Sequence, residues 1–265
     1  MQAKERKLDA DIIIIEQTFV ADGASGRNGG FLNTSIAHGE TNIEAQFPGE
    51  ADELEALGEQ NIKELLETLE KYNIDARYEN ASMTTVALDE GSAVRLYEEY
   101  QEAIAEEDEA GNEEAIWFDK EAIRKEVNSP ICHAGLMYRG GLDGVVDPAR
   151  LCFGLKDVLL NQLGVRIFEG TKLIDVKPVG KDSMVANCEG GMIHSKKVLM
   201  ATNAFTSSIG RIRRSVIPIW DYQIATEPLT DAQLDKINWG KPESRHALGD
   251  NVNMFHYFRL TKDNR

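Results

Sequence analysis

The sequence feature that most constrains the fold is the stretch from Asp11 to Phe31, which reads DIIIIEQTFVADGASGRNGGF. Its four consecutive isoleucines form a β-branched run without polar alternation, which is typical of a parallel strand covered on both faces by helices. The run ends in Glu16. Dinucleotide-binding folds place at such a position the carboxylate that accepts hydrogen bonds from a ribose diol.

A turn-rich segment, Gly23 to Gly30, follows this strand. Its four glycines allow positive φ angles and close approach of the backbone to a ligand, and its Ser, Arg and Asn residues supply donors suited to an anion. Taken separately, an acid-ended strand and a glycine-rich turn are more often plain structure than a binding site. In this order they favour a phosphate-binding loop.

Together these residues resemble the FAD-dependent oxidoreductases of the D-amino-acid oxidase, glycine oxidase and sarcosine oxidase superfamily, especially the branch of gamma-glutamylputrescine oxidase. The resemblance continues through GLDGVVDPARL at 141–151, VLMATNAFT at 198–206 and YFRLTKDNR at the C-terminus. It implies an α/β fold in which an FAD-type Rossmann domain is interleaved with a sheet-containing substrate domain. We expect residues 1–76 and 146–216 in the FAD domain and 77–145 and 217–265 in the substrate domain, with Ile12–Ile15 and Val198–Met200 in one sheet.

The resemblance also implies roles for individual residues around FAD. We expect Glu16 to hold the adenosine ribose and Val176 to contact adenine through its backbone. The pyrophosphate and the inner flavin edge are expected to be lined by Ser25, Arg27, Asn28, Gly29 and Gly30, and Ala201 and Thr202 are expected to flank the cofactor. Asn203 follows them at a strand end, where a plain helix cap is the alternative.

The sequence does not identify the catalytic residues, because flavin carries the redox chemistry and the protein orients the substrate. His38 follows the loop and is the histidine expected nearest the flavin. Tyr257 and Arg259 share one face of a C-terminal strand, where they either bind a substrate carboxylate or form an ordinary surface pair. The five histidines lack metal-ligand spacing, so no metal site is expected.

The amino-acid composition argues against some classes of function. With 45 acidic and 29 basic residues the net charge is −16, which argues against nucleic acid as a partner. No apolar run has the length of a membrane span and the start lacks the apolar core of a signal peptide, so the expected location is the cytoplasm. The three cysteines are scattered and indicate reduced thiols.

The predicted function is oxidation of the C–N bond of a primary or secondary amine or amino acid, with dioxygen or another acceptor reoxidising the flavin. A nicotinamide-dependent dehydrogenase and a non-catalytic interaction protein remain as alternatives. Only fifteen residues precede Glu16, whereas a complete dinucleotide unit places a strand, a GxGxxG turn and a helix there. We therefore expect a chain that lacks this first βα unit and a final strand partner, and that by itself binds FAD weakly or not at all, with little or no turnover.

The secondary-structure pattern is clear in several places. The spacing predicts helices over 48–72, 90–110, 120–126, 148–163 and 230–237, and strands over 165–168, 172–177, 184–188 and 192–194. Two short strands are expected within 77–88. An apolar run from Ser215 to Thr226 predicts a further sheet, and 246–260 a return to strands.

Overall fold

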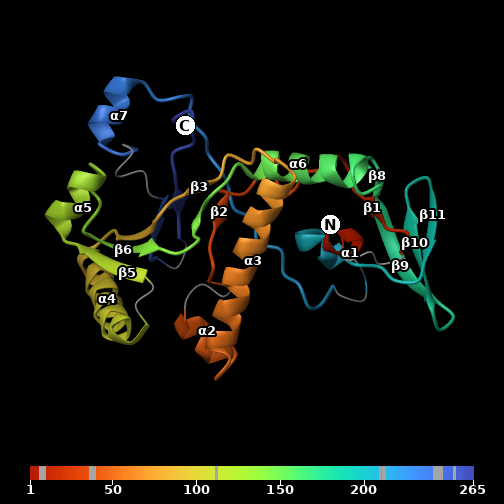
Figure 1. Ribbon diagram of the computed structural model, residues 1–265, viewed down its shortest axis with the longest axis horizontal. Coiled ribbons are helices and arrows are strands. Elements are labelled where there is room, and N and C mark those ends of the chain that lie inside the picture. The colour runs from red at the N-terminus through yellow and green to blue at the C-terminus, as the bar shows by residue number, and fades with distance from the viewer. Residues whose placement is uncertain are drawn as a thin grey trace. The chain divides into compact units, whose positions relative to one another are not determined.

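The structure, a computed structural model, describes residues 1–5, 10–35, 40–110, 113–208, 210, 213–240, 247–252 and 255–265. The chain forms two compact units (Figure 1). The first consists of Met1–Asn28 with Pro148–Gln223, and the second of Gly29–Asp147 with Ile224–Arg265. Residues 29–76 therefore group with the second unit. The assignment of FAD and substrate roles to the predicted domains stays a prediction.

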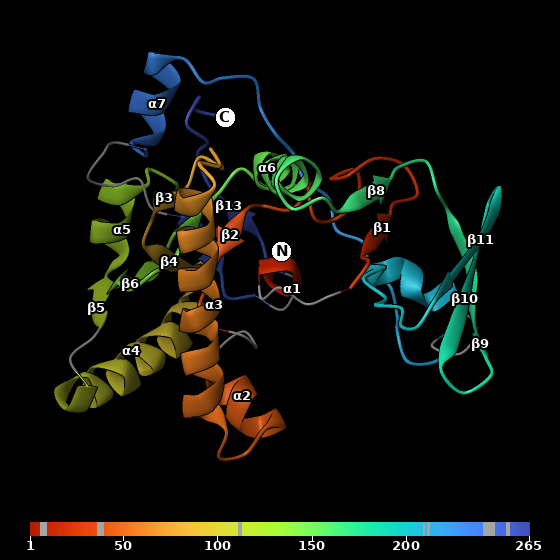
Figure 2. The same ribbon diagram turned by 45° about the vertical axis from the view of Figure 1, so that its right-hand side comes forward.

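In the part of the first unit that the structure describes, there are two small sheets and one long helix. Strand β1 (Ile13–Ile15) pairs in parallel with β8 (Arg166–Phe168), with Ile14 opposite Ile167. Strands β9 (Leu173–Val179), β10 (Ser183–Cys188) and β11 (Gly191–Ser195) form an antiparallel sheet in the order β11-β10-β9. The helices are α1 (Gln2–Glu5), α6 (Pro148–Asn161) and the 3-10 helix η1 (Asn203–Ser208). Figure 2 shows β1 and β8 side by side.

The isoleucine run is a parallel strand, as predicted, but it is less covered than its composition suggests. Ile14 keeps 36% of its surface exposed. The expectation that Val198–Met200 shares its sheet is wrong, because these residues form no strand and Leu199 is 93% exposed. A strand needs a neighbour to satisfy its backbone groups, and in the described chain none pairs with 198–200.

The second unit is built around a five-stranded mixed sheet. Its order is β13 (Tyr257–Phe258), β12 (Ala247–Asp250), β4 (Met83–Ala87), β6 (Ala134–Gly140) and β5 (Glu113–Phe118). A smaller antiparallel sheet joins β2 (Phe31–Leu32), β7 (Gly144–Val145) and β3 (Glu79–Asn80). The helices are α2 (Glu40–Gln46), α3 (Ala51–Lys71), α4 (Glu90–Ala110), α5 (Lys120–Glu126) and α7 (Asp231–Ile237).

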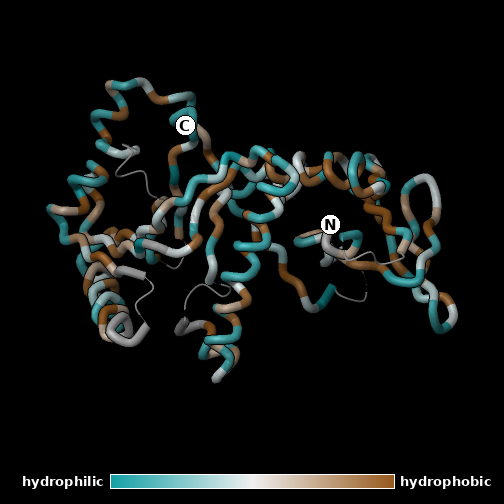
Figure 3. The backbone as a smooth tube through the Cα atoms, viewed as in Figure 1, coloured by the Kyte–Doolittle hydropathy of each residue, from teal (hydrophilic) through white to brown (hydrophobic). Residues whose placement is uncertain are grey.

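Local rules place most of these helices where the sequence predicts them. The Asp119 carboxylate accepts hydrogen bonds from the amides of Glu121 and Ala122 and so begins α5. Helices α3 and α4 carry teal and brown residues in alternation (Figure 3), as expected of helices with one apolar face. That face of α4 buries Leu96 against Leu136 of β6 and Ala115 of β5.

One further prediction from the sequence is wrong, and one strand was missed. The run from Ser215 to Thr226 forms no strand among the described residues, and Ile217, Ile219 and Tyr222 are exposed. Its apolar pattern predicts a sheet, but in the described part of the chain no strand lies beside it to accept its backbone hydrogen bonds. The interior strand β6 was not predicted, because its run AGLMYRG contains two glycines and no β-branched residues.

No helix in the described ranges combines the length and the apolar character that crossing a membrane requires.

Candidate functional site

The first part of the candidate site lies where β1 ends. The Glu16 amide donates to the Phe168 carbonyl at 2.9 Å, and the Glu16 carbonyl accepts from the Thr171 amide at 2.8 Å. The Glu16 carboxylate accepts a hydrogen bond from the Thr18 amide at 3.2 Å. The carboxylate thus stands at the carboxyl end of a parallel strand, the edge at which open α/β sheets bind their ligands.

The glycine-rich segment folds into consecutive tight turns. The Gly26 amide donates to the Gly23 carbonyl at 3.1 Å and the Arg27 amide to the Ala24 carbonyl at 3.3 Å. The Asn28 side-chain amide donates to the carbonyls of Ala24 and Ser25, both at 3.0 Å. A Cβ atom at position 26 would stand 2.2 Å from the carbonyl oxygen of Ala21, so only glycine fits there. Asn28 therefore helps to shape the loop.

The charged residues of this loop pair locally. Arg27 Nη2 lies 2.6 Å from Asp22 Oδ1, and the Thr18 hydroxyl donates to Asp22 Oδ2 at 2.6 Å. The Thr18 bond, and after it the Arg27 bond, hold the pKa of Asp22 below its usual value. The Arg27 side chain remains 69% exposed. An anion at the loop would share this guanidinium, which has five N–H donors, with Asp22.

Val176, Ala201 and Thr202 occupy separate elements of the same unit. Val176 belongs to β9 and lies opposite Ala186 of β10. In the described chain β9 is an edge strand of its sheet, so alternate backbone groups of β9 face away from β10. Such groups are suited to the predicted backbone contact. Ala201 is exposed, and Thr202 Oγ1 lies 2.7 Å from Thr206 Oγ1 at the start of η1. This contact joins two side-chain hydroxyls, whereas a helix cap bonds a side-chain oxygen to a backbone amide.

The second unit brings the end of the loop to the predicted C-terminal candidates. Gly30 has φ +74°, and its carbonyl accepts the Val146 amide at 2.7 Å. A Cβ atom at Gly30 would stand 2.9 Å from Arg259 Nη2. The Tyr257 ring lies 5.0 Å from that of Phe31, and burial raises the pKa of its hydroxyl. Gly30, Tyr257 and Arg259 therefore form one neighbourhood, which no spacing in the sequence indicates.

Three of the five histidines lie within the described residues. His38 and His246 lie outside the described residues. His256 Nδ1 lies 2.7 Å from Oδ2 of Asp250, whose side chain is fully buried and whose other oxygen accepts the His256 amide at 3.1 Å. This pair closes the turn between β12 and β13. Within the described ranges no cluster of three or more His, Cys, Asp or Glu residues is arranged to hold a metal ion.

Two acidic residues of the first unit were not identified from sequence. Asp22 binds Arg27, and Glu169 accepts the Val20 amide at 2.7 Å. A signal for Glu169 exists in hindsight, since it follows β8 as Glu16 follows β1. Neighbouring parallel strands end at the same edge of a sheet.

A comparison with protein-family models adds an independent finding. The model described as "DAO: FAD dependent oxidoreductase" matches residues 1–265. Among curated proteins, the chain is 29% identical over 261 residues to the probable oxidoreductase OrdL of Haemophilus influenzae and 27% identical to the gamma-glutamylputrescine oxidoreductase of Escherichia coli. These alignments cover 96% of this chain but 58% and 57% of those proteins. The chain thus spans a little over half the length of these relatives.

Solved structures share the fold. Glycine oxidase from Geobacillus kaustophilus superimposes with a TM-score of 0.59 and 23% identity, over 79% of this chain and 52% of that one. L-proline dehydrogenase from P. horikoshii gives a TM-score of 0.64 with 15% identity, over 99% of this chain and 63% of that one.

Proposed function

The chain belongs to the DAO family of FAD dependent oxidoreductases, and from this premise we propose that its residues bind FAD and, in a whole protein, support oxidation of a C–N bond in a primary or secondary amine or amino acid. When bound, the flavin accepts a hydride equivalent from the substrate and passes the electrons to dioxygen or another acceptor. The protein's own part is to bind the cofactor, orient the amine and exclude water.

The observation that carries the proposal is the junction of β1 with the glycine-rich turns. Glu16 stands at the carboxyl end of a parallel strand, and within a few residues the chain makes tight turns that tolerate no side chain at position 26. The Gly26 and Arg27 amides bond within the loop, so the groups that it offers to a pyrophosphate are exposed side chains. Ser25, Arg27 and Asn28 are exposed there. This donor set fits a dinucleotide.

We assign the roles accordingly. Glu16 accepts hydrogen bonds from the adenosine ribose, the loop residues Ser25, Arg27, Asn28, Gly29 and Gly30 line the pyrophosphate and inner flavin edge, and Val176 contacts adenine. Ala201 and Thr202 flank the cofactor. Tyr257 and Arg259, which lie beside Gly30, are the candidates for contact with the substrate.

The substrate class rests on the names of similar proteins, which refer to gamma-glutamylputrescine, glycine and L-proline. All three compounds contain an amine nitrogen next to a carbon that carries hydrogen. The structure is compatible with this class, because the Tyr257 hydroxyl and the Arg259 guanidinium supply polar groups beside an aromatic surface.

The direct test is a titration of the purified chain with FAD, followed by flavin absorbance and fluorescence. Saturable one-to-one binding that is lost on replacing Glu16 supports the proposal. Bleaching of the flavin bands by an amine, in this chain or in a longer protein that contains it, supports the reaction. A chain that shows no saturable flavin binding and instead binds a nicotinamide dinucleotide contradicts it.

A further inference from the structure

The turn that carries Glu16 is fixed by a segment far along the chain. Residues Phe168 to Thr171 continue beyond β8 and bond to the turn at successive points. In addition to the two backbone bonds of Glu16, the Gly170 amide donates to the Thr18 carbonyl at 2.8 Å and the Glu169 carboxylate accepts the Val20 amide at 2.7 Å. The path of residues 16–20 is therefore set by residues 168–171.

Glu169 is itself held by a lysine of helix α6. Lys156 Nζ lies 2.7 Å from Glu169 Oε1, the same oxygen that accepts the Val20 amide. The lysine, and after it the Val20 amide, lowers the pKa of Glu169, so the group is a carboxylate at neutral pH. We call Lys156, Glu169 and the Val20 amide the Lys156–Glu169 clamp.

We infer that the Lys156–Glu169 clamp positions Glu16 for the ribose of the cofactor, an inference that rests on the proposed function. The link runs through Thr18, whose amide donates to Glu16 Oε1 at 3.2 Å while its carbonyl is bound by Gly170. Release of Val20 frees the chain on the far side of Thr18 and lets the Glu16 carboxylate leave the strand edge. Glu169 and Lys156 thus act as positioning residues through Glu16.

A positioning role of the clamp has to be separated from a stabilising one. The side chains of Lys156 and Glu169 are 25% and 33% exposed, so the pair is partly buried. A loss of stability alone would weaken the binding of every flavin, whereas misplacement of Glu16 weakens only the binding of a flavin that carries the adenosine ribose. The same unit provides a matched control. Lys172, the residue before β9, places its Nζ 3.1 Å from Oε1 of Glu189 in the turn between β10 and β11, and the two side chains are 50% and 61% exposed.

The experiment compares affinity for FAD with affinity for FMN, which lacks the adenosine ribose. Wild type, Glu169→Gln, Lys156→Met, Lys156→Arg and the control Glu189→Gln are titrated with each flavin, and hydrogen exchange at residues 16–22 is followed. We expect Glu169→Gln and Lys156→Met to weaken FAD binding about tenfold, as for the loss of one charge-assisted bond, with FMN affinity unchanged. Hydrogen exchange at residues 16–22 is expected to rise in Glu169→Gln and Lys156→Met. Lys156→Arg and the control Glu189→Gln are expected to keep the FAD affinity and the hydrogen exchange of the wild type.

The outcomes separate the two claims. A wild type without measurable flavin binding, both as this chain and within a longer protein that contains it, contradicts the proposed function, and with it any positioning of a cofactor. Wild type that binds FAD while Glu169→Gln binds it equally well overturns the clamp alone. Equal losses for FAD and FMN overturn it too, because they show a general loss of the fold.

Discussion

The guanidinium of Arg259 lies against the α-carbon of Gly30, so close that an ideal Cβ atom at Gly30 would stand 2.9 Å from Nη2 and 2.1 Å from the carbonyl oxygen of Val146. The end of the glycine-rich loop therefore packs against the segment that carries Tyr257 and Arg259. Both residues of this contact belong to the second unit.

Replacing Gly30 by alanine tests this contact. Its φ of +74° costs an L-residue about 1–2 kcal/mol, and the clash with Val146 and Arg259 adds to that cost. The control is Gly49→Ala, since Gly49 has φ +76° in the same unit but nothing within 4 Å of a Cβ atom. Chemical unfolding should show a larger loss for Gly30→Ala. Equal losses would contradict the close approach.

Replacing Glu16 by alanine should weaken FAD binding by about 1.5–3 kcal/mol, the value of hydrogen bonds to a charged group. That is roughly 10- to 150-fold in the dissociation constant measured by flavin fluorescence. Asp182→Ala, in the exposed turn between β9 and β10, is the control and should change nothing. Unchanged FAD affinity in Glu16→Ala would refute the assigned role.

The core of the second unit is tested at Leu136. This β6 residue is fully buried against Ala87, Leu96 and Ala115, and Leu136→Ala should cost about 2–5 kcal/mol through lost burial and a cavity. Val94→Ala, on the exposed side of α4, should stay within about 0.5 kcal/mol. The unfolding midpoint in denaturant measures both. Similar midpoints for the two variants would mean that β6 is not a central strand.

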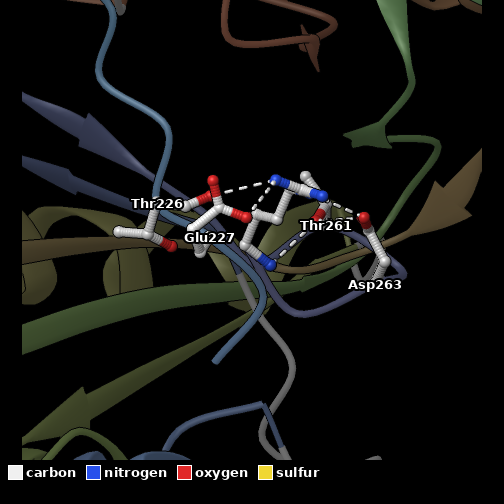
Figure 4. Close-up of polar contacts among 5 residues, drawn as sticks. Thr226, Glu227, Thr261 and Asp263 are labelled. Atoms are coloured by element: carbon white, nitrogen blue, oxygen red, sulfur yellow. Dashed lines mark hydrogen bonds and ion pairs between the residues drawn. The ribbon is translucent and has the colours of Figure 1, made fainter. Parts of the chain in front are cut away.

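A pH effect is expected in the C-terminal turn, where Arg265 bonds to Thr226, Thr261 and Asp263 (Figure 4). The bonds from Arg265 and then Thr261 lower the pKa of Asp263 to about 2. Because this pKa is below its ordinary value of 3.8, the carboxylate stabilises the turn above that value, and the effect is lost as the pH falls toward 2.

The measurement is an NMR titration of the Asp263 carboxyl carbon. We expect a midpoint near 2 in the wild type and a return toward the ordinary value in Arg265→Met. A wild-type midpoint at the ordinary value would show that the Arg265 bond does not form in solution.

The sequence by itself determined the elements that depend on local interactions. Helix α4 spans the predicted residues 90–110, and α5 begins at Asp119 because a side-chain cap needs only its neighbours. The isoleucine run predicted a parallel strand correctly, and the order of Glu16 and the glycine turns pointed to the family that the comparison with family models then confirmed.

Pairing over long distances was decided only by the tertiary structure. The runs at 198–200 and 215–226 have the composition of strands, but a strand exists only where another chain segment accepts its hydrogen bonds. Likewise, the Glu169 carboxylate binds the Val20 amide, and the Arg259 guanidinium packs against Gly30, because strand pairing brings distant segments together. The sequence thus predicts which residues bind a flavin, whereas the fold determined which distant side chains hold their turns in place.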